Sequence, residues 1–362
     1  MKPGASRFAR LESLRGFAAL YVCFDHFAVS RLAASRWSYL LRFGSEAVML
    51  FFLLSGFVVY YATVGKPDSG FRAYFIKRAR RIFPLFLLSL PLAYAVACYL
   101  ARGWAPLHGR VLLGNVLMLQ DLAFDKPGVW FDAYGNPALW SLSYEWWFYM
   151  LFYVVHTLVR PPAAQKYVAL AISTLGLLGY LAYPNQICLY LMYFIIWWGG
   201  VEMAREYCDH GTVTWRGQRP MIAALTGTAL AWTSLYLRRN GGPLRFGVHP
   251  FLEWRHIASA LLFVVGGIFW HRHKFRGFDL FPGPFIVLAP ISYALYVFHY
   301  PLLTLSSALP TAGNRPLSLA LFLGSALLLA YLGERRLQPW INRRTDRLLV
   351  RPRPRPQEIE PA

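Results

Sequence analysis

The segment RGFAALYVCFDH (residues 15–26) places a cation and an imidazole at the two ends of an apolar run. In an α-helix the eleven steps from Arg15 to His26 make close to three turns, so both side chains share a face, roughly 16 Å apart along the axis. Ionisable groups inside a membrane helix are costly and usually mark a substrate pathway, a proton relay or a reacting centre. The alternative is a helix whose arginine reaches the lipid headgroups while the histidine bonds a neighbouring carbonyl.

The composition of the whole chain indicates a membrane protein. Of 362 residues, 57% are hydrophobic and 15% are charged, whereas a soluble domain has about 25% charged residues. The 13 Trp and 22 Tyr are typical of a chain with aromatic belts at the membrane interfaces. We therefore expect an all-α polytopic integral membrane protein with about ten transmembrane helices. The apolar windows lie at 16–32, 46–64, 84–101, 138–158, 167–183, 188–204, 220–237, 256–271, 283–305 and 316–334.

Basic residues are distributed unevenly around these windows. With a cytoplasmic N-terminus, the cytoplasmic segments hold 26 of the 37 Lys and Arg residues. Cytoplasmic loops of membrane proteins carry such an excess, so both termini are predicted to lie in the cytosol. The net charge of +20 then faces anionic lipid or an anionic substrate. Nucleic acid is a poor alternative, because the arginines flank the apolar windows and no soluble basic module is present.

We expect one membrane-embedded domain over residues 1–340 and a basic, Pro-rich cytoplasmic tail over 341–362 that has no means of packing. The first apolar run follows a basic start, as in a signal peptide, but Asp25 and His26 within it favour a retained helix. The long outer segment 102–137 is expected to be functional and to shape an acceptor pocket or lid, with a short interfacial or re-entrant helix near 111–120. The four cysteines have no Cys-x-x-Cys spacing, so neither a disulfide framework nor a zinc site is indicated.

Two groups of polar residues lie near the ends of predicted helices. Arg78 and Arg81 precede the third window and are three residues apart, so their guanidinium groups can converge on one anion. A basic run that only orients the helix is the alternative. Glu145 enters the fourth window from the outer face, with Ser141 and Tyr149 four residues away on the same side. A carboxylate at this depth is neutral, paired with a cation or a histidine, or exposed to a wet cavity.

Three smaller features complete the pattern. The Ser55-Gly56 step in the second window permits close approach of another backbone. The ninth window holds a second buried histidine, His299, before a predicted break at Pro301. Glu202 is expected at a partly solvated position near the cytosol.

In this order the motifs resemble the acyltransferase-3 family, bacterial integral-membrane O-acyltransferases that modify polysaccharides and antibiotics. The resemblance covers roughly residues 9–340. It rests on Arg15-x10-His26, Phe51-Phe52-x-Leu54-Ser55-Gly56-Phe57, Arg78-x-x-Arg81-Ile82-x-Pro84, Trp140-Ser141-Leu142-Ser143-x-Glu145 and the segment from Ser292 to Pro301.

The resemblance also implies roles for individual residues. It implies that Arg15 and His26 are required for activity, that Arg78 and Arg81 face the acyl donor, and that Glu145 is functional. Many members have Glu-Glu-Gln where this chain has Glu145-Trp146-Trp147, and many carry a C-terminal esterase-like domain that has no counterpart in this sequence. Both departures weaken any inference about the acceptor.

The reaction implied is transfer of an acyl group, with acetyl favoured, from cytosolic acyl-CoA to a hydroxyl of a carbohydrate or glycolipid at the bacterial inner (cytoplasmic) membrane. The phosphates of acyl-CoA, a co-substrate, are expected to bind Arg78 and Arg81, and no permanently bound cofactor or metal is expected. A neutral His26 then deprotonates the acceptor hydroxyl, while Glu145 binds the acceptor or supports His26. Direct transfer is favoured over an acyl-enzyme, because no Gly-x-Ser-x-Gly motif is present. The secondary site candidates are His299, Ser143 and Tyr149.

Asp25 is not expected to orient His26, because adjacent residues of a helix point about 100° apart. A secondary transporter of glycans or lipid-linked sugars is the alternative function, since it also explains ten helices, buried ionisable residues and basic cytosolic loops. We see no inverted repeats that would favour it. A non-catalytic assembly protein leaves Arg15, His26 and Glu145 without a purpose.

Overall fold

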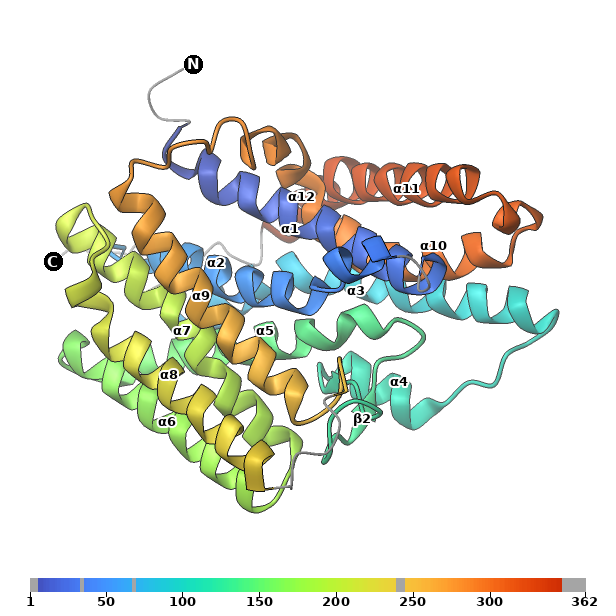
Figure 1. Cartoon of the computed structure of the whole chain (residues 1–362). Helices are drawn as coiled ribbons and strands as arrows, with labels where there is room; N and C mark the ends of the chain where they lie inside the picture. Colours follow the sequence, from blue (N-terminus) through green and yellow to red (C-terminus); the bar gives the residue numbers. More distant parts are fainter. Residues whose placement is uncertain (1–5, 33–35, 67–69, 239–244, 347–362) are drawn as a thin grey trace, which may run out of the picture.

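The computed structural model describes residues 6–32, 36–66, 70–238 and 245–346, which form an almost entirely helical bundle (Figure 1). Its α-helices are α1 (Ser6–Arg31), α2 (Gly44–Thr63), α3 (Gly70–Ala101), α4 (Gly109–Val116), α5 (Trp140–Leu158), α6 (Pro162–Ala182), α7 (Gln186–His210), α8 (Trp215–Arg238), α9 (Phe251–Arg272), α10 (Ser292–Ala308), α11 (Arg315–Leu332) and α12 (Gln338–Thr345). The shorter elements are η1 (Arg36–Leu41), β1 (Gln120–Asp121), β2 (Phe131–Asp132), η2 (Pro137–Leu139), η3 (Gly283–Ile291), η4 (Pro310–Gly313) and the π-helical turn η5 (Gly333–Leu337).

Seven helical segments in the described part of the chain are long and apolar enough to cross a membrane. They are Tyr39–Thr63, Gly70–Ala101, Gln186–His210, Trp215–Arg238, Phe251–Arg272, Gly283–Ala308 and Arg315–Thr345. Each contains one of the predicted windows, or most of one. The other three windows, 16–32, 138–158 and 167–183, fall almost entirely on α1, α5 and α6, which pack in the same bundle. The fold is therefore that of a multi-pass membrane protein.

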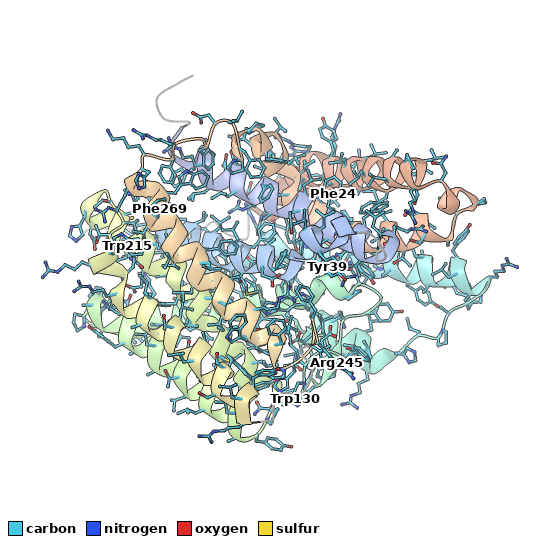
Figure 2. All side chains as sticks on the ribbon, viewed as in Figure 1. Phe24, Tyr39, Trp130, Trp215, Arg245 and Phe269 are labelled. Carbon is cyan, nitrogen blue, oxygen red and sulfur yellow. The ribbon has the colours of Figure 1, made fainter. Side chains whose placement is uncertain are left out.

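Helices α1 and α2 connect the two sides of the bundle. On one side α6, α7, α8 and α9 pack in succession, and on the other α10 packs against α3 and α11 (Figure 1). Helix α2 contacts α7 and α9, while α1 contacts η3 and α10. Figure 2 marks the two ends of the bundle, with Trp215 and Phe269 at one end and Trp130 and Arg245 at the other. Any site between α1 and α2 is consequently lined by residues from both sides.

The α2–α7 packing depends on glycine. A Cβ atom added at Gly56 would lie 2.0 Å from the Trp197 carbonyl oxygen, and one at Gly200 would lie 1.9 Å from the Leu53 carbonyl oxygen. The close backbone approach predicted at Ser55-Gly56 is thus confirmed, since no larger side chain fits there. It holds Ser55 at a fixed depth against the core of the bundle.

Several prolines lie inside the described helices, and for two of them a side chain bonds the carbonyl that the proline frees. Pro84, the first residue of the third predicted window, lies within α3, and Pro301, where a break was predicted, lies within α10 without a break. A proline removes the N–H that would bond the carbonyl four residues earlier. The Gln338 side chain donates to the freed Arg80 carbonyl at 2.6 Å, and the Asn136 side chain donates to the freed Val297 carbonyl at 2.9 Å.

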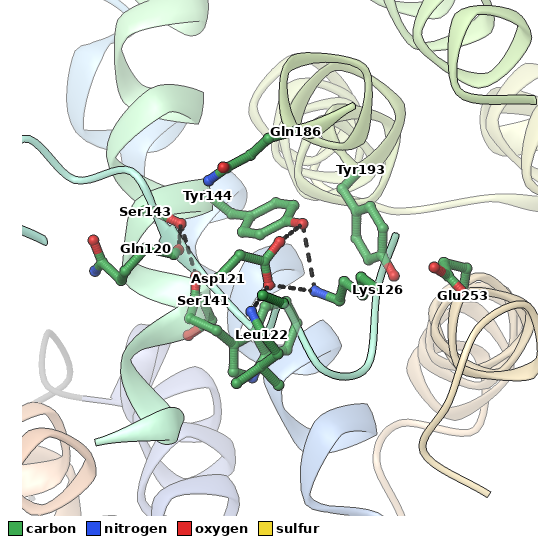
Figure 3. Close-up of polar contacts among 12 residues, drawn as sticks. Gln120, Asp121, Leu122, Lys126, Ser141, Ser143, Tyr144, Gln186, Tyr193 and Glu253 are labelled. Carbon is green, nitrogen blue, oxygen red and sulfur yellow. Dashed lines mark hydrogen bonds and ion pairs between the residues drawn. The ribbon is translucent and has the colours of Figure 1, made fainter. Parts of the chain in front are cut away.

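The segment between α3 and α5 is anchored in the bundle. The strands β1 and β2 form a short parallel pair after α4, which is the short helix predicted near this position. Asp121 and Lys126 are fully buried and form an ion pair at 2.8 Å, and the Tyr144 hydroxyl donates to the same carboxylate at 2.5 Å (Figure 3). Burial of a paired charge with its hydrogen bonds satisfied fixes the position of this segment.

One prediction about solvation is wrong. Glu202 is 6% exposed, pairs with Arg205 at 3.0 Å and accepts a hydrogen bond from the Trp198 indole at 2.9 Å. The cation one helical turn further on allows the carboxylate to be buried.

Candidate active site

Two cavities lie on either side of Tyr296, which contributes to the walls of both. The His26 cavity has a volume of about 370 Å³, and its ionisable wall residues are Asp25, His26, Arg42, Asp125, Arg255 and His256. The arginine cavity has a volume of about 210 Å³, and its polar wall residues include Arg15, Ser55, Arg78, Arg81, Glu145 and Tyr149. Those predicted site residues that line a cavity therefore separate into two groups, and α1 contributes to both.

His26 and His299 form a hydrogen-bonded pair with parallel rings. His26 Nδ1 lies 2.7 Å from His299 Nε2, and the two ring planes are 9° apart. His299 Nδ1 lies 2.7 Å from the Tyr296 carbonyl oxygen. A carbonyl only accepts, so His299 Nδ1 carries a proton and its Nε2 accepts from His26 Nδ1–H. This chain fixes the neutral tautomer of His26 in which Nε2 holds the free electron pair.

Asp25 lies close to His26 in the structure. Its Oδ2 atom is 3.9 Å from His26 Nε2. The two Cβ atoms diverge from the helix, but both side chains extend into the cavity beside α1. A Cβ at Gly44 would lie 2.4 Å from the same Oδ2 atom, so the start of α2 fixes the carboxylate. The 3.9 Å separation is too long for a hydrogen bond, and His26 Nδ1 is bonded by His299 instead, so Asp25 lies near His26 without orienting its ring, as predicted.

Glu145 lies in the arginine cavity, where its carboxylate is held by two hydroxyl groups. Ser55 Oγ donates to Glu145 Oε1 at 2.8 Å, and the Tyr149 hydroxyl donates to the same oxygen. The hydrogen-bond and ion-pair partners of His26 are instead His299 and Asp25. The structure does not bring Glu145 to His26, so the predicted support of His26 by Glu145 is not observed.

Arg78 and Arg81 both line the arginine cavity but differ in their contacts. Arg81 pairs with the Glu334 carboxylate at 3.0 Å, whereas the Arg78 guanidinium lies over the Tyr74 and Tyr149 rings at 5.3 and 5.4 Å. The buried Arg78 Nε atom has no hydrogen-bond partner among the described residues. Arg78 is therefore the arginine of this pair that retains bonding capacity for an anion or carbonyl.

The wall between the two cavities is polar. The Tyr296 hydroxyl donates to the Ala138 carbonyl and lies 2.8 Å from Ser141 Oγ. Ser143, a predicted secondary candidate, donates instead to the Gln120 and Trp140 carbonyls at 2.7 and 2.8 Å, and it lines neither cavity (Figure 3). In the described structure Ser143 contacts the backbone, and Ser141 lies at the boundary of the site.

His256 was missed by the sequence analysis. It is fully buried in the wall of the His26 cavity, its Nδ1 lies 2.6 Å from the Tyr193 hydroxyl, and its ring stacks on Trp140. Its Nε2 has no partner among the described residues. The sequence does show His256 at the start of an apolar window, which could have marked it as a candidate. No pattern in the neighbouring sequence, however, indicates that it lies near the His26 cavity.

Asp125 brings the segment between α3 and α5 into the same cavity wall. Burial raises the pKa of its carboxyl, while the neighbouring Lys126 acts in the opposite direction. The His26 cavity thus combines two imidazoles with acidic and basic groups, as suits a polar, hydroxyl-rich molecule. The ionisable groups of the arginine cavity are three arginines, three tyrosines and Glu145, as suits an anionic or carbonyl-containing molecule.

Comparison with known proteins identifies the family. The family model of an acyltransferase domain matches residues 8–335. The acyltransferase MdmB of Streptomyces mycarofaciens is 33% identical over 167 residues, 44% of this chain and 42% of that protein. The putative peptidoglycan O-acetyltransferase YrhL of Bacillus subtilis (strain 168) is 27% identical over 352 residues, 84% of this chain and 50% of that protein. The putative acetyltransferase ORF330 of Acidianus two-tailed virus is 28% identical over 149 residues, 41% of each.

The chain spans half or less of the length of these curated relatives. No solved structure matches it. The family model nevertheless covers all five motifs, both cavities and nearly all of the described helices. The chain therefore belongs to the acyltransferase-3 family.

Proposed function

We propose that this protein is a membrane O-acyltransferase that moves an acyl group, with acetyl favoured, from cytosolic acyl-CoA to a hydroxyl of a carbohydrate or glycolipid. The observation that carries the proposal is the hydrogen-bonded chain from the Tyr296 carbonyl through His299 to His26. It holds His26 Nε2 ready to accept a proton in a cavity of about 370 Å³. A general base needs this tautomer and this access.

The proposal includes a membrane orientation. With both termini in the cytosol of a bacterial cell and α1, α5 and α6 as three further spans, the chain has ten spans in the inner membrane. The arginine cavity then faces the cytosolic half, where acyl-CoA is available. The His26 cavity faces the outer half, next to the segment between α3 and α5, and receives the acceptor there.

The reaction follows from these positions. The acceptor hydroxyl gives its proton to His26 Nε2 as its oxygen attacks the thioester carbonyl. The new C–O bond forms, the C–S bond breaks, and the departing CoA thiolate takes the proton from His26. Asp25, 3.9 Å from Nε2, stabilises the imidazolium formed between these steps. Arg15 and Arg78 hold the donor in the arginine cavity, and Glu145 keeps Tyr149 and Ser55 in place around it.

The test is acceptor-dependent CoA release by the protein in nanodiscs, with acetyl-CoA and a crude bacterial glycan extract. We expect release by the wild type and a loss of about 10²- to 10⁴-fold in His26→Ala. His210→Ala, which changes an exposed histidine at the end of α7, serves as the matched control. Folded wild-type protein that releases no CoA with any donor or glycan would contradict the proposal and favour a transporter.

A further inference from the structure

A third hollow lies at the opposite end of α2 from the His26 cavity. Its volume is about 770 Å³, and it is formed by the end of α2, the first half of α3, the end of α5 and the start of α6. We call it the Lys77 groove. Helix α2 has 20 residues, so its two ends are about 30 Å apart, which is the thickness of a bilayer core.

The Lys77 groove is strongly basic. Four cations line it, namely Lys66, Lys77, Arg78 and Arg160. None of its described wall residues is Asp or Glu. Four cations around one groove, without an acid among the described residues that line it, favour a ligand with several negative charges.

Aromatic side chains form much of the remaining wall. Tyr74 and Tyr153 lie with ring centroids 5.0 Å apart, and the Phe152 and His156 rings stack at 5.1 Å. Aromatic surfaces of this kind bind the flat face of a nucleobase with little preference for the base. A basic groove with an aromatic wall suits a phosphorylated nucleoside better than a simple phosphate.

Arg78 joins the groove to the arginine cavity, because it lines both. Its guanidinium lies between Tyr74, a wall residue of the groove, and Tyr149, a wall residue of the cavity. A ligand with an anionic head in the groove can thus extend a thin arm past Arg78 towards Glu145.

We propose that the Lys77 groove binds the nucleotide end of acyl-CoA, with its 3′-phosphate and diphosphate held by Lys66, Lys77 and Arg160. The pantetheine arm then passes Arg78 and brings the thioester into the arginine cavity. This inference rests on the proposed function and revises its sequence-based form, in which Arg78 and Arg81 hold the phosphates. Arg81 is paired with Glu334, and the arginine cavity of about 210 Å³ suits the thioester end of the donor.

The experiment compares two donors that differ only in the nucleotide. Acetyl-CoA carries it, and S-acetylpantetheine lacks it. In the double variant Lys77→Ala/Arg160→Ala, both exposed positions, we expect kcat/KM for acetyl-CoA to fall roughly tenfold to hundredfold. The value for S-acetylpantetheine stays unchanged. Adenosine 3′,5′-bisphosphate should compete with acetyl-CoA in the wild type and compete at least tenfold more weakly in the variant.

The control variant Arg216→Ala/Arg219→Ala removes two charges from exposed positions at the start of α8 and should leave both donors unaffected. Equal losses for the two donors, or no loss for acetyl-CoA, would overturn the inference and leave the proposed function standing. A loss seen only in nanodiscs with anionic lipid would overturn it too, because it would assign the groove to a lipid headgroup. A wild type that turns over neither donor contradicts the proposed function itself.

Discussion

The two cavities beside Tyr296 share α1 but differ in chemistry. In the His26 cavity the central group is a histidine whose tautomer is fixed by a second histidine and a backbone carbonyl. In the arginine cavity the central carboxylate, Glu145, is bonded by two hydroxyls and surrounded by three arginines. The histidine arrangement is suited to accepting and releasing a proton, and the arginine arrangement is suited to binding a charged or polar group. Under the proposed function, Arg15 and His26 lie three turns apart on one helix because they serve different steps.

The largest effect in this comparison is expected at His299. A leucine there cannot accept from His26 Nδ1, so His26 loses the bond that fixes its tautomer, and we expect kcat to fall about 10²-fold with little change in either KM. A glutamine can donate to the Tyr296 carbonyl and accept from His26, so His299→Gln should retain activity within about tenfold. Steady-state kinetics of CoA release measures both. Equal activity of the two variants would show that His299 is only a packing residue.

The arginine cavity should respond differently, through binding. Arg78→Ala removes the cation with free bonding capacity, and we expect the KM for acetyl-CoA to rise about tenfold or more while kcat changes less. The KM for the acceptor should stay constant, since the proposed function places the acceptor in the other cavity. An increase in both KM values would show that the cavities do not divide donor from acceptor.

Within the same cavity, Arg81 is expected to stabilise the fold, whereas Arg78 is expected to bind the donor. Arg81→Ala leaves the buried Glu334 carboxylate unpaired, and we expect a loss of about 1–3 kcal/mol in unfolding free energy. The double variant Arg81→Ala/Glu334→Gln should recover most of that loss, because it removes the unpaired charge. Thermal unfolding in detergent measures the three proteins side by side. A stable single variant with weakened donor binding would return Arg81 to the donor site.

The smallest effect is expected at the boundary itself. Tyr296→Phe removes the hydroxyl that bonds Ala138 and Ser141, and we expect a two- to tenfold loss of transfer. Release of CoA without acceptor should increase, because water gains access to the thioester. The ratio of acceptor-independent to acceptor-dependent release measures the separation of the cavities. An unchanged ratio would indicate that the aromatic ring alone forms the boundary.

Local patterns predicted most of the helices and most of the chemistry-bearing residues. Apolar windows located the spans, and Arg15 and His26, which the helical spacing put on one face of a helix, each line a cavity beside α1. The pairing of His26 with His299 and the separation of Glu145 from His26 could not be predicted. Both features depend on how α1, α5 and α10 pack against one another. The spacing of residues within one helix carries no information about that packing.

Pro84 shows a second reason for the errors. The third predicted window begins at this proline, since a proline fits the start of a helix. In the structure α3 continues through Pro84, and Gln338 bonds the carbonyl that the proline frees. A contact with a distant part of the chain overrides the local rule.

The two amide side chains that bond freed carbonyls also bear on the order of assembly. Helix α3 is synthesised long before Gln338, and Asn136 is synthesised long before α10. The carbonyls freed by Pro84 and Pro301 each gain a partner from a segment made at a different time, so the Arg80 carbonyl of α3 is bonded only after the C-terminal end of the bundle has been made. The last described helix, α12, donates a hydrogen bond from Gln338 to α3, the helix that carries Arg78. Truncation before Gln338 should therefore destabilise the donor side of the site first.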